Sequence, residues 1–217
     1  MILWKQLRIP FLAVTFGSIL WVFGKVILLP STDRHSVTPF IFPEEVPLPG
    51  WQPLASHPLV KPINKELIAG RRYQYSQNER VLDIEMRYLG SSTGDVKILM
   101  KDYTSLPWSL VLYKKDGIGF YSSLVYQERV YLSACINPEG GTTVTERQFK
   151  QSRNRYSVVP SRLLPWLLGQ KPLKDTRCLW ALLSIPIKDT SPEAASQSLE
   201  KVWFSWYEWW QPRFPQH

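Results

Sequence analysis

The chain has 217 residues, 44% of them hydrophobic, and a formal net charge of +8. This length allows one domain with a sizeable core plus an accessory segment, and the apolar content is too high for a disordered chain. The positive charge is spread along the chain and no nucleic-acid-binding motif is recognisable, so nucleic acid is disfavoured as a partner.

Residues 9–29 form an apolar run whose one charge is Lys25. Because a helix rises about 1.5 Å per residue and the hydrocarbon layer is roughly 30 Å thick, this run is long enough to span a membrane. A cleaved signal peptide is the alternative, but the run is longer than a usual signal-peptide core and no small-residue cleavage site follows. Lys5 and Arg8 precede the run. We therefore expect an anchor over residues 1–30, single-pass in the plasma membrane, with a cytoplasmic N-terminus and an extracytoplasmic (periplasmic) main domain.

Residues 31–62 are rich in proline. Proline fixes φ and removes a backbone donor, so this segment cannot be a helix and is a poor candidate for a central strand. We expect a proline-rich tether over residues 31–62. It should dock on the domain at Gly50 and Trp51, with the indole buried.

The main domain is expected over residues 63–217. Apolar alternation and turn signals predict strands at residues 71–76, 80–89, 118–127, 129–136 and 176–187. Helical signals predict helices at residues 143–155, 161–168 and 191–210, the last with Pro192 in its first turn. Residues 96–103 fit either a strand or a short helix. Because strands mostly come first and helices later, we predict an α+β fold with a mainly antiparallel sheet and packed helices.

The two cysteines, Cys135 and Cys178, have three interpretations. A nucleophilic Cys135 needs a base or a cation to lower the pKa of its thiol. The histidines lie outside the predicted core elements. Arg177 precedes Cys178 and an arginine could hold a thiolate, but neighbouring residues of a strand point to opposite faces. A disulfide between Cys135 and Cys178 fits an oxidising compartment, and two buried free thiols are the third interpretation.

Other chemistry has weaker signals. No closely spaced ligand set predicts a metal site, and no cofactor-binding loop is recognisable. Asp83 and Glu85 share one face of a predicted strand, a pattern more typical of a solvated sheet face than of a catalytic dyad.

Two surfaces are candidates for partner contacts. Arg147, Lys150 and Arg153 recur every three residues, which places them along one helical stripe. That stripe is either a solvated face or a contact for anionic headgroups, acidic glycan or a partner protein. Trp206, Trp209 and Trp210 belong to an aromatic C-terminal helix, which either packs on the sheet or contacts a membrane or a membrane protein.

Four strings in the second half of the chain stand out together: SACINPEGGTTVT, QFKQSRNRY, LLPWLLGQKPLKDTRCLWALLSIPI and WFSWYEWWQPRFP. Together they resemble the cyanoexosortase A system-associated protein family of cyanobacteria. The likeness runs from about residue 50 to residue 214 and is most specific from residue 131 onward, and the N-terminal anchor matches as well.

A more distant likeness is to the exosortase-associated exopolysaccharide proteins. It rests on Gly50-Trp51 and on Cys135 followed by Pro138 and a glycine pair. Those proteins carry a Cys-Leu-Pro-Gly-Gly-Gly-Trp motif after a His-Ser-Pro. This chain lacks the histidine, the third glycine and the tryptophan, so any Cys-His chemistry of that wider group does not carry over.

The resemblance implies a context. Exosortases are multi-span membrane cysteine transpeptidases that process proteins with a short C-terminal sorting signal, often alongside exopolysaccharide export. We expect an accessory protein, leaning to non-catalytic, that supports such an enzyme, with the membrane and polysaccharide as further partners. The alternatives are a processing enzyme acting through Cys135 and a polysaccharide-binding module.

Overall fold

The computed structural model describes residues 2–28, 40–59, 66–107, 109–157, 174–188 and 190–215. The chain divides into two compact units, Met1–Ser36 and Val37–His217. The first contains helix α1 (Ile2–Leu28). Large apolar side chains are exposed along it, with Ile9 77% and Trp21 73% accessible. Within the described part of the chain, no helix is both long and apolar enough to cross a membrane.

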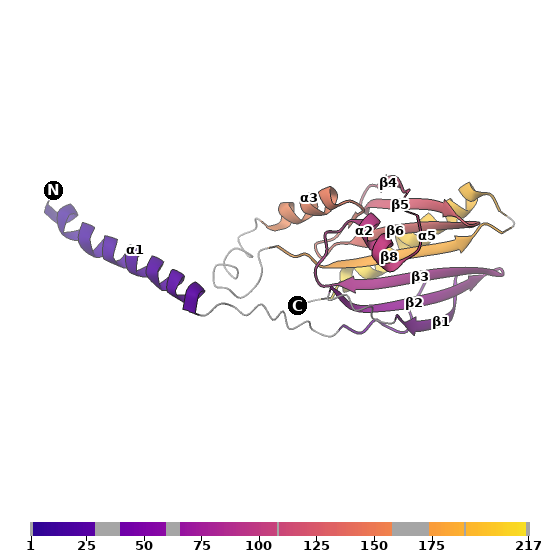
Figure 1. Ribbon diagram of the computed structural model, residues 1–217, viewed down its shortest axis with the longest axis horizontal. Helices are drawn as coiled ribbons and strands as arrows, with labels where there is room; N and C mark the ends of the chain where they lie inside the picture. Colours follow the sequence, from indigo (N-terminus) through magenta and orange to yellow (C-terminus); the bar gives the residue numbers. More distant parts are fainter. Residues whose placement is uncertain are drawn as a thin grey trace. The chain divides into compact units, whose positions relative to one another are not determined.

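The second unit contains a single eight-stranded sheet with helices (Figure 1). The strands are β1 (Gln52–Pro58), β2 (Leu67–Gln77), β3 (Arg80–Leu89), β4 (Val111–Lys115), β5 (Gly119–Tyr126), β6 (Arg129–Ile136), β7 (Thr142–Thr143) and β8 (Cys178–Pro186). The helices are α2 (Val96–Tyr103), α3 (Glu146–Ser157), α5 (Pro192–Trp210) and the 3-10 helix η1 (Gln211–Arg213). Strand order is β1-β2-β3-β8-β6-β7-β5-β4, and only the short β5–β7 contact is parallel. The predicted α+β fold with a mainly antiparallel sheet is confirmed.

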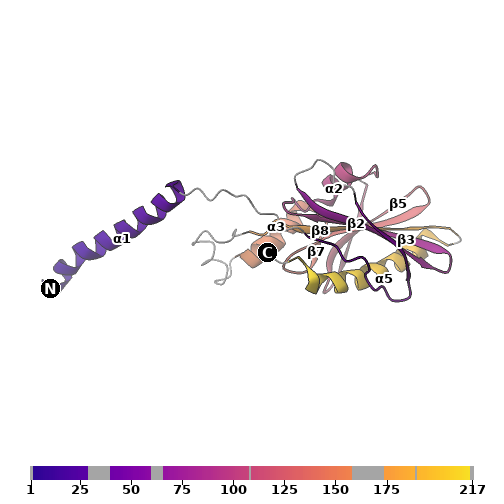
Figure 2. The same ribbon diagram turned by 90° about the horizontal axis from the view of Figure 1, so that it is seen from below.

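Strand β8 lies in the middle of the sheet, between β3 and β6. It is buried along nearly its whole length because side chains on both of its faces are covered. Figure 2 shows α2 and α5 on opposite sides of the sheet. The α5 side carries the larger core, and the α2 side carries a smaller one that includes both cysteines. The sequence of a strand that is covered on both faces is typically a continuous run of apolar residues, as it is in β8 apart from Ser184.

Helix α5 forms where the sequence predicted it. Ser191 caps its N-terminus by accepting a hydrogen bond from the amide of Ala194 at 3.2 Å, and Pro192 follows in the first turn. A serine cap satisfies an amide that has no partner within the helix, and proline at this position costs no hydrogen bond. One stripe of α5 is buried against the sheet: Ala195, Leu199, Val202, Trp203, Trp206, Tyr207 and Trp210.

The expected tether over residues 31–62 is wrong for residues 40–59, which belong to the domain. Phe42 and Val46 are buried in the larger core, and β1 pairs with β2. The hydroxyls of Tyr73 and Tyr75 donate to the carbonyls of Pro43 (2.9 Å) and Val46 (2.8 Å). These bonds hold a segment whose prolines exclude a helix. As predicted, the indole of Trp51 is buried.

Three local predictions have different outcomes. Residues 96–103 form helix α2, whose N-cap Asp95 accepts from the amide of Lys97 at 2.9 Å. Helix α3 starts three residues later than predicted, because Thr145 and Gln148 form a reciprocal capping box at its start. The helix predicted at residues 161–168 lies outside the described residues.

Candidate functional site

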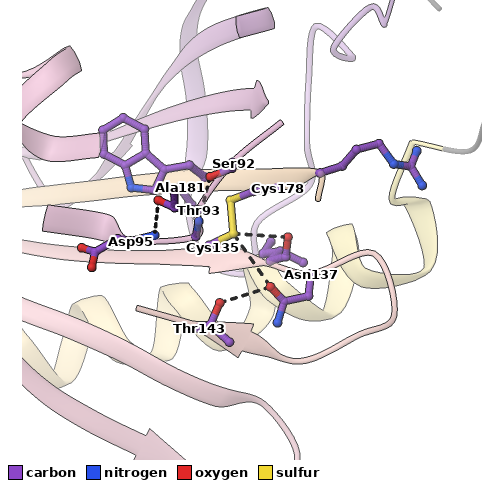
Figure 3. Close-up of a disulfide and its surroundings, with 12 residues drawn as sticks. Ser92, Thr93, Asp95, Cys135, Asn137, Thr143, Cys178 and Ala181 are labelled. Atoms are coloured by element: carbon purple, nitrogen blue, oxygen red, sulfur yellow. Dashed lines mark hydrogen bonds between the residues drawn. A yellow bond between two sulfur atoms is a disulfide. The ribbon is translucent and has the colours of Figure 1, made fainter. Parts of the chain in front are cut away.

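The structure joins Cys135 and Cys178 as a disulfide between β6 and β8 (Figure 3). Their Cα atoms are 5.7 Å apart, and both residues are fully buried. Of the three interpretations open from the sequence, the structure therefore contains the disulfide. A thiolate is the nucleophilic form of cysteine, so Cys135 bound to a second sulfur cannot start that chemistry without prior reduction.

The turn that follows Cys135 is organised by Asn137. The backbone N–H of Asn137 donates to the Gly141 carbonyl at 3.0 Å. The side-chain oxygen of Asn137 accepts from the Thr143 hydroxyl at 3.2 Å (Figure 3). Gly140 and Gly141 both have positive φ, a conformation that glycine adopts without strain. The backbone N–H of Gly141 donates to the Tyr207 hydroxyl of α5 at 2.9 Å. The glycine pair thus ties the disulfide-bearing strand to α5.

The Arg177 guanidinium forms its hydrogen bonds with groups other than the disulfide sulfurs. Its guanidinium donates to both oxygens of Asp175, to the Tyr88 hydroxyl at 3.2 Å and to the Pro215 carbonyl at 2.6 Å. Burial alone would lower the pKa of Arg177, but the hydrogen bonds and charge of Asp175 and Tyr88 raise it above its ordinary value. The suggested role beside a thiolate is therefore wrong. Arg177 instead connects the start of β8 to the C-terminal residues.

A small hollow lies beside the Asn137 turn. It is lined by Asn137, Pro138, Glu139, Phe149, Ser152, Arg153 and Asp175. The Nε of Arg153 is buried without a hydrogen-bond partner, and its guanidinium carbon lies 5.8 Å from the centre of the Phe149 ring. A buried donor without an acceptor is costly, and a single water molecule would be enough to satisfy it.

The three cations of the predicted basic stripe on α3 differ in their exposure to solvent. Arg147 and Lys150 are exposed, and Lys150 pairs with Glu146 one turn earlier. Arg153 is half-buried at the hollow. Arg147 and Lys150 thus remain available at the surface, whereas Arg153 is part of the wall of the hollow.

Two of the three tryptophans proposed for partner or membrane contact are core residues. Trp206 is 0% exposed and Trp210 is 1% exposed. The Trp206 ring packs edge-on against Tyr73 at 5.3 Å, and its Nε1 donates to the sulfur of Met86 at 3.2 Å. The assignment of Trp206 and Trp210 to a contact surface is wrong, because their stripe covers the sheet. Trp209 is half-buried and stacks under the guanidinium of Arg213 at 4.5 Å.

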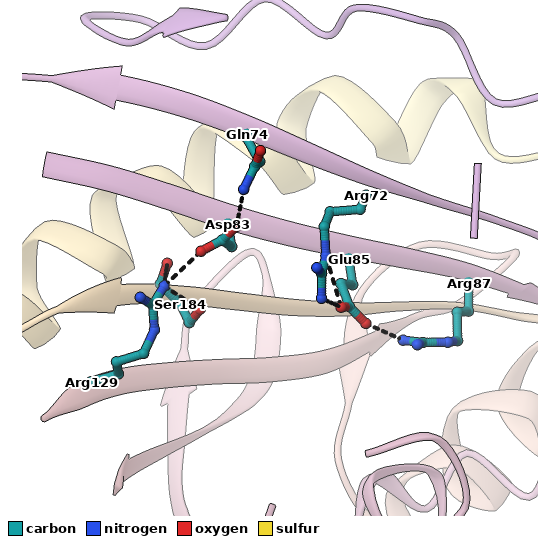
Figure 4. Close-up of polar contacts among 7 residues, drawn as sticks. All are labelled: Arg72, Gln74, Asp83, Glu85, Arg87, Arg129 and Ser184. Atoms are coloured by element: carbon teal, nitrogen blue, oxygen red, sulfur yellow. Dashed lines mark hydrogen bonds and ion pairs between the residues drawn. The ribbon is translucent and has the colours of Figure 1, made fainter. Parts of the chain in front are cut away.

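Part of the α2 side of the sheet carries a charged network that the sequence did not reveal (Figure 4). Asp83 on β3 receives bonds from Gln74 on β2 at 2.8 Å and from Arg129 on β6 at 2.7 Å. Arg129 also donates to the Ser184 hydroxyl on β8 at 3.0 Å. Four strands therefore contribute to this half of the network.

Glu85 is the centre of the other half (Figure 4). It pairs with Arg72 across the β2–β3 register and with Arg87 at 2.8 Å. The hydrogen bond to Glu85 raises the pKa of Arg72 above its ordinary value. Arg87 is only 8% exposed, with its guanidinium carbon 5.1 Å from the Trp180 ring centre and 5.2 Å from that of Tyr103. Each carboxylate is thus paired with at least one arginine, and the charge-assisted bonds from Arg72 and Arg129 connect different strands of the sheet.

These paired charges had one sequence signal, the alternation of polar residues along adjacent strands. That pattern predicts that the polar residues share a face. It does not predict the strand order β3-β8-β6, on which the contact between Arg129 and Asp83 depends. Among the described residues, no group of three or more His, Cys, Asp or Glu side chains is placed to hold a metal ion.

Comparison of the chain with family models, with curated proteins and with solved structures gives no match.

Proposed function

We propose that this protein is a membrane-anchored accessory protein of an exosortase-type sorting and exopolysaccharide export system, and that it supports the transpeptidase without catalysing the reaction. In this proposal residues 1–30 anchor the chain in the plasma membrane and the domain lies outside the cytoplasm.

The observation that carries the proposal is the buried Cys135–Cys178 disulfide. Disulfides form and persist in oxidising compartments, which supports an extracytoplasmic domain. The same bond occupies the candidate nucleophile, which weighs against a processing enzyme acting through Cys135. The exposed apolar side chains along α1 and the cations Lys5 and Arg8 ahead of the apolar run support the anchor.

The system itself comes from the resemblance of the second half of the chain to the cyanoexosortase A system-associated proteins. In the structure, several residues of this half of the chain have packing or hydrogen-bonding roles within the domain. Asn137 and Gly141 connect the disulfide-bearing strand to α5, and the buried rings of Trp206 and Trp210 cover the sheet. A polysaccharide-binding module is less well supported. Aromatic rings that stack on sugars must be accessible, whereas those of Trp206 and Trp210 are buried.

The direct test is co-purification from mild detergent. The full-length chain with a C-terminal tag is expected to retain the exosortase of the same cells. A chimera in which residues 1–30 are replaced by an unrelated single-pass helix should retain it as well if the domain makes the contact. Recovery of the full-length chain without detergent in a soluble fraction would contradict the anchor. Repeated failure to retain the enzyme, with normal sorting in a deletion strain, would contradict the accessory role.

A further inference from the structure

The two edges of the sheet differ in how they are protected. At one edge, β1 contains Pro53 and Pro58, and its register with β2 shifts between Pro53 and Ala55. Proline removes a backbone donor and an irregular register distorts the edge, so β1 is a poor template for a further strand. At the other edge, β4 is a regular five-residue strand without proline, and every one of its side chains is exposed.

The exposed side chains of β4 begin with an apolar group. Val111 is 58% accessible, Leu112 47% and Tyr113 43%. Val125 of the neighbouring strand β5 adds a further exposed apolar side chain, 52% accessible. Native proteins usually protect a sheet edge with charge or a covering segment, and on β4 the charged side chains are confined to the second half, so the exposed apolar first half indicates a contact surface.

Tyr113 rests on a fixed support. Its ring stacks on that of Tyr121 at 5.6 Å with an interplanar angle of 15°. Tyr121 in turn donates to the Glu200 carboxylate of α5 at 3.0 Å. The edge is therefore held in place by the core beneath it, and a strand that pairs with it does not have to order it first.

The second half of β4 is cationic on both faces of the sheet. Successive residues of a strand point to opposite faces, so Lys114 and Lys115 supply one cation to each. The Lys114 ammonium lies 5.9 Å from the Phe120 ring centre, and the Lys115 ammonium lies 5.3 Å from that of Phe204. In the part of the chain that the structure describes, neither lysine forms an ion pair.

We propose that β4 is a docking edge for an extended, acidic segment of another protein, which adds to the sheet as a ninth strand. Main-chain hydrogen bonds supply affinity in such strand addition, and alternate side chains supply specificity. In an antiparallel segment, two adjacent acidic residues lie opposite Lys115 and Lys114. After one intervening residue, two apolar residues lie opposite Leu112 and Val111.

The lysines also determine which occupant is disfavoured. A second copy paired antiparallel through its own β4 and centred on Tyr113 would place Lys114 and Lys115 opposite the apolar Leu112 and Val111, so it would supply no opposite charge to either lysine. The same cations attract an acidic strand, so the edge discriminates between the two by charge. This inference does not depend on the exosortase assignment.

The test uses the full-length chain in detergent micelles and a labelled, end-blocked peptide containing Asp-Glu-Thr-Val-Val, with binding measured by fluorescence anisotropy. Lys114→Glu together with Lys115→Glu is expected to weaken binding by about tenfold or more. The matched control is Lys97→Glu with Lys101→Glu on exposed positions of α2, which changes the net charge equally and should alter binding less than about twofold. N-methylation of alternate peptide amides should abolish binding in one alternate set and leave it intact in the other, because only every second amide faces β4.

Several outcomes would overturn the proposal. No binding at millimolar peptide, or equal weakening by the α2 control, would remove the acidic-segment specificity. Equal binding of both N-methylated peptides would exclude strand addition. Self-association of the unmodified chain that disappears in the β4 variant would assign the edge to a second copy instead.

Discussion

Reduction of the Cys135–Cys178 bond is expected to lower the free energy of unfolding by about 4 kcal/mol. The two residues are 43 positions apart, and the chain-entropy relation for a closed loop of that length gives this value. The cost arises mainly in the unfolded chain, because the reduced sulfurs remain packed between β6 and β8.

The assay is urea unfolding of the oxidised protein and of protein that has been unfolded, reduced and refolded with reductant. With a denaturant dependence of about 2 kcal/mol per molar urea, the midpoint should fall by roughly 2 M. The control is Cys135→Ala with Cys178→Ala, whose midpoint should be low and should not respond to reductant. Unchanged unfolding of the natural chain in reductant, with two thiols alkylated after unfolding without reductant, would refute the disulfide and the compartment inferred from it.

Three further predictions test the packing and the buried hydroxyls. Gly119→Ala should destabilise by about 2 kcal/mol more than Gly117→Ala in urea unfolding. Both glycines have positive φ, but only at Gly119 does an added Cβ approach the β7 backbone, at 2.5 Å, so equal losses would contradict this steric reason. Trp206→Ala should cost about 3–5 kcal/mol and Trp209→Ala less than half of that, because only Trp206 is fully buried; a reversed order would contradict the assignment of the core face. Burial, followed by the Glu200 hydrogen bond, raises the pKa of Tyr121 from 10.0 to about 12, so the unfolded chain loses this proton first and stability should fall between pH 10 and 12. Tyr121→Phe should reduce that slope in unfolding curves across this range, and an unchanged slope would count against the shift.

Local signals accounted for much of the fold. Alternating apolar residues predicted the two hairpins, and the turn at residues 78–79 lies where the sequence placed the break between β2 and β3. The Ser191 cap and Pro192 predicted the start of α5. These signals arise from residues close in sequence, so they can be recognised without knowing which distant segments the element packs against.

The candidate site depended more on partners distant in sequence. The sequence left Cys135 open between nucleophile, disulfide and free thiol, because the choice requires Cys178 to lie on the adjacent strand. It also left Trp206 and Trp210 open between a core face and a contact face, since helical spacing defines a stripe but not what covers it. Strand β4 had no sequence prediction, and its exposure follows only from its place at the end of the sheet.

By itself, the sequence determined the apolar N-terminal run, the α+β class and the positions of the main hairpins and of the last helix. Tertiary structure alone decided that residues 40–59 join the domain, where the hydroxyls of Tyr73 and Tyr75 donate to the carbonyls of Pro43 and Val46. It also decided that Arg129 reaches Asp83 over β8. The physical reason is that periodicity and caps report forces within a few residues, whereas burial and charge pairing depend on which strands lie side by side.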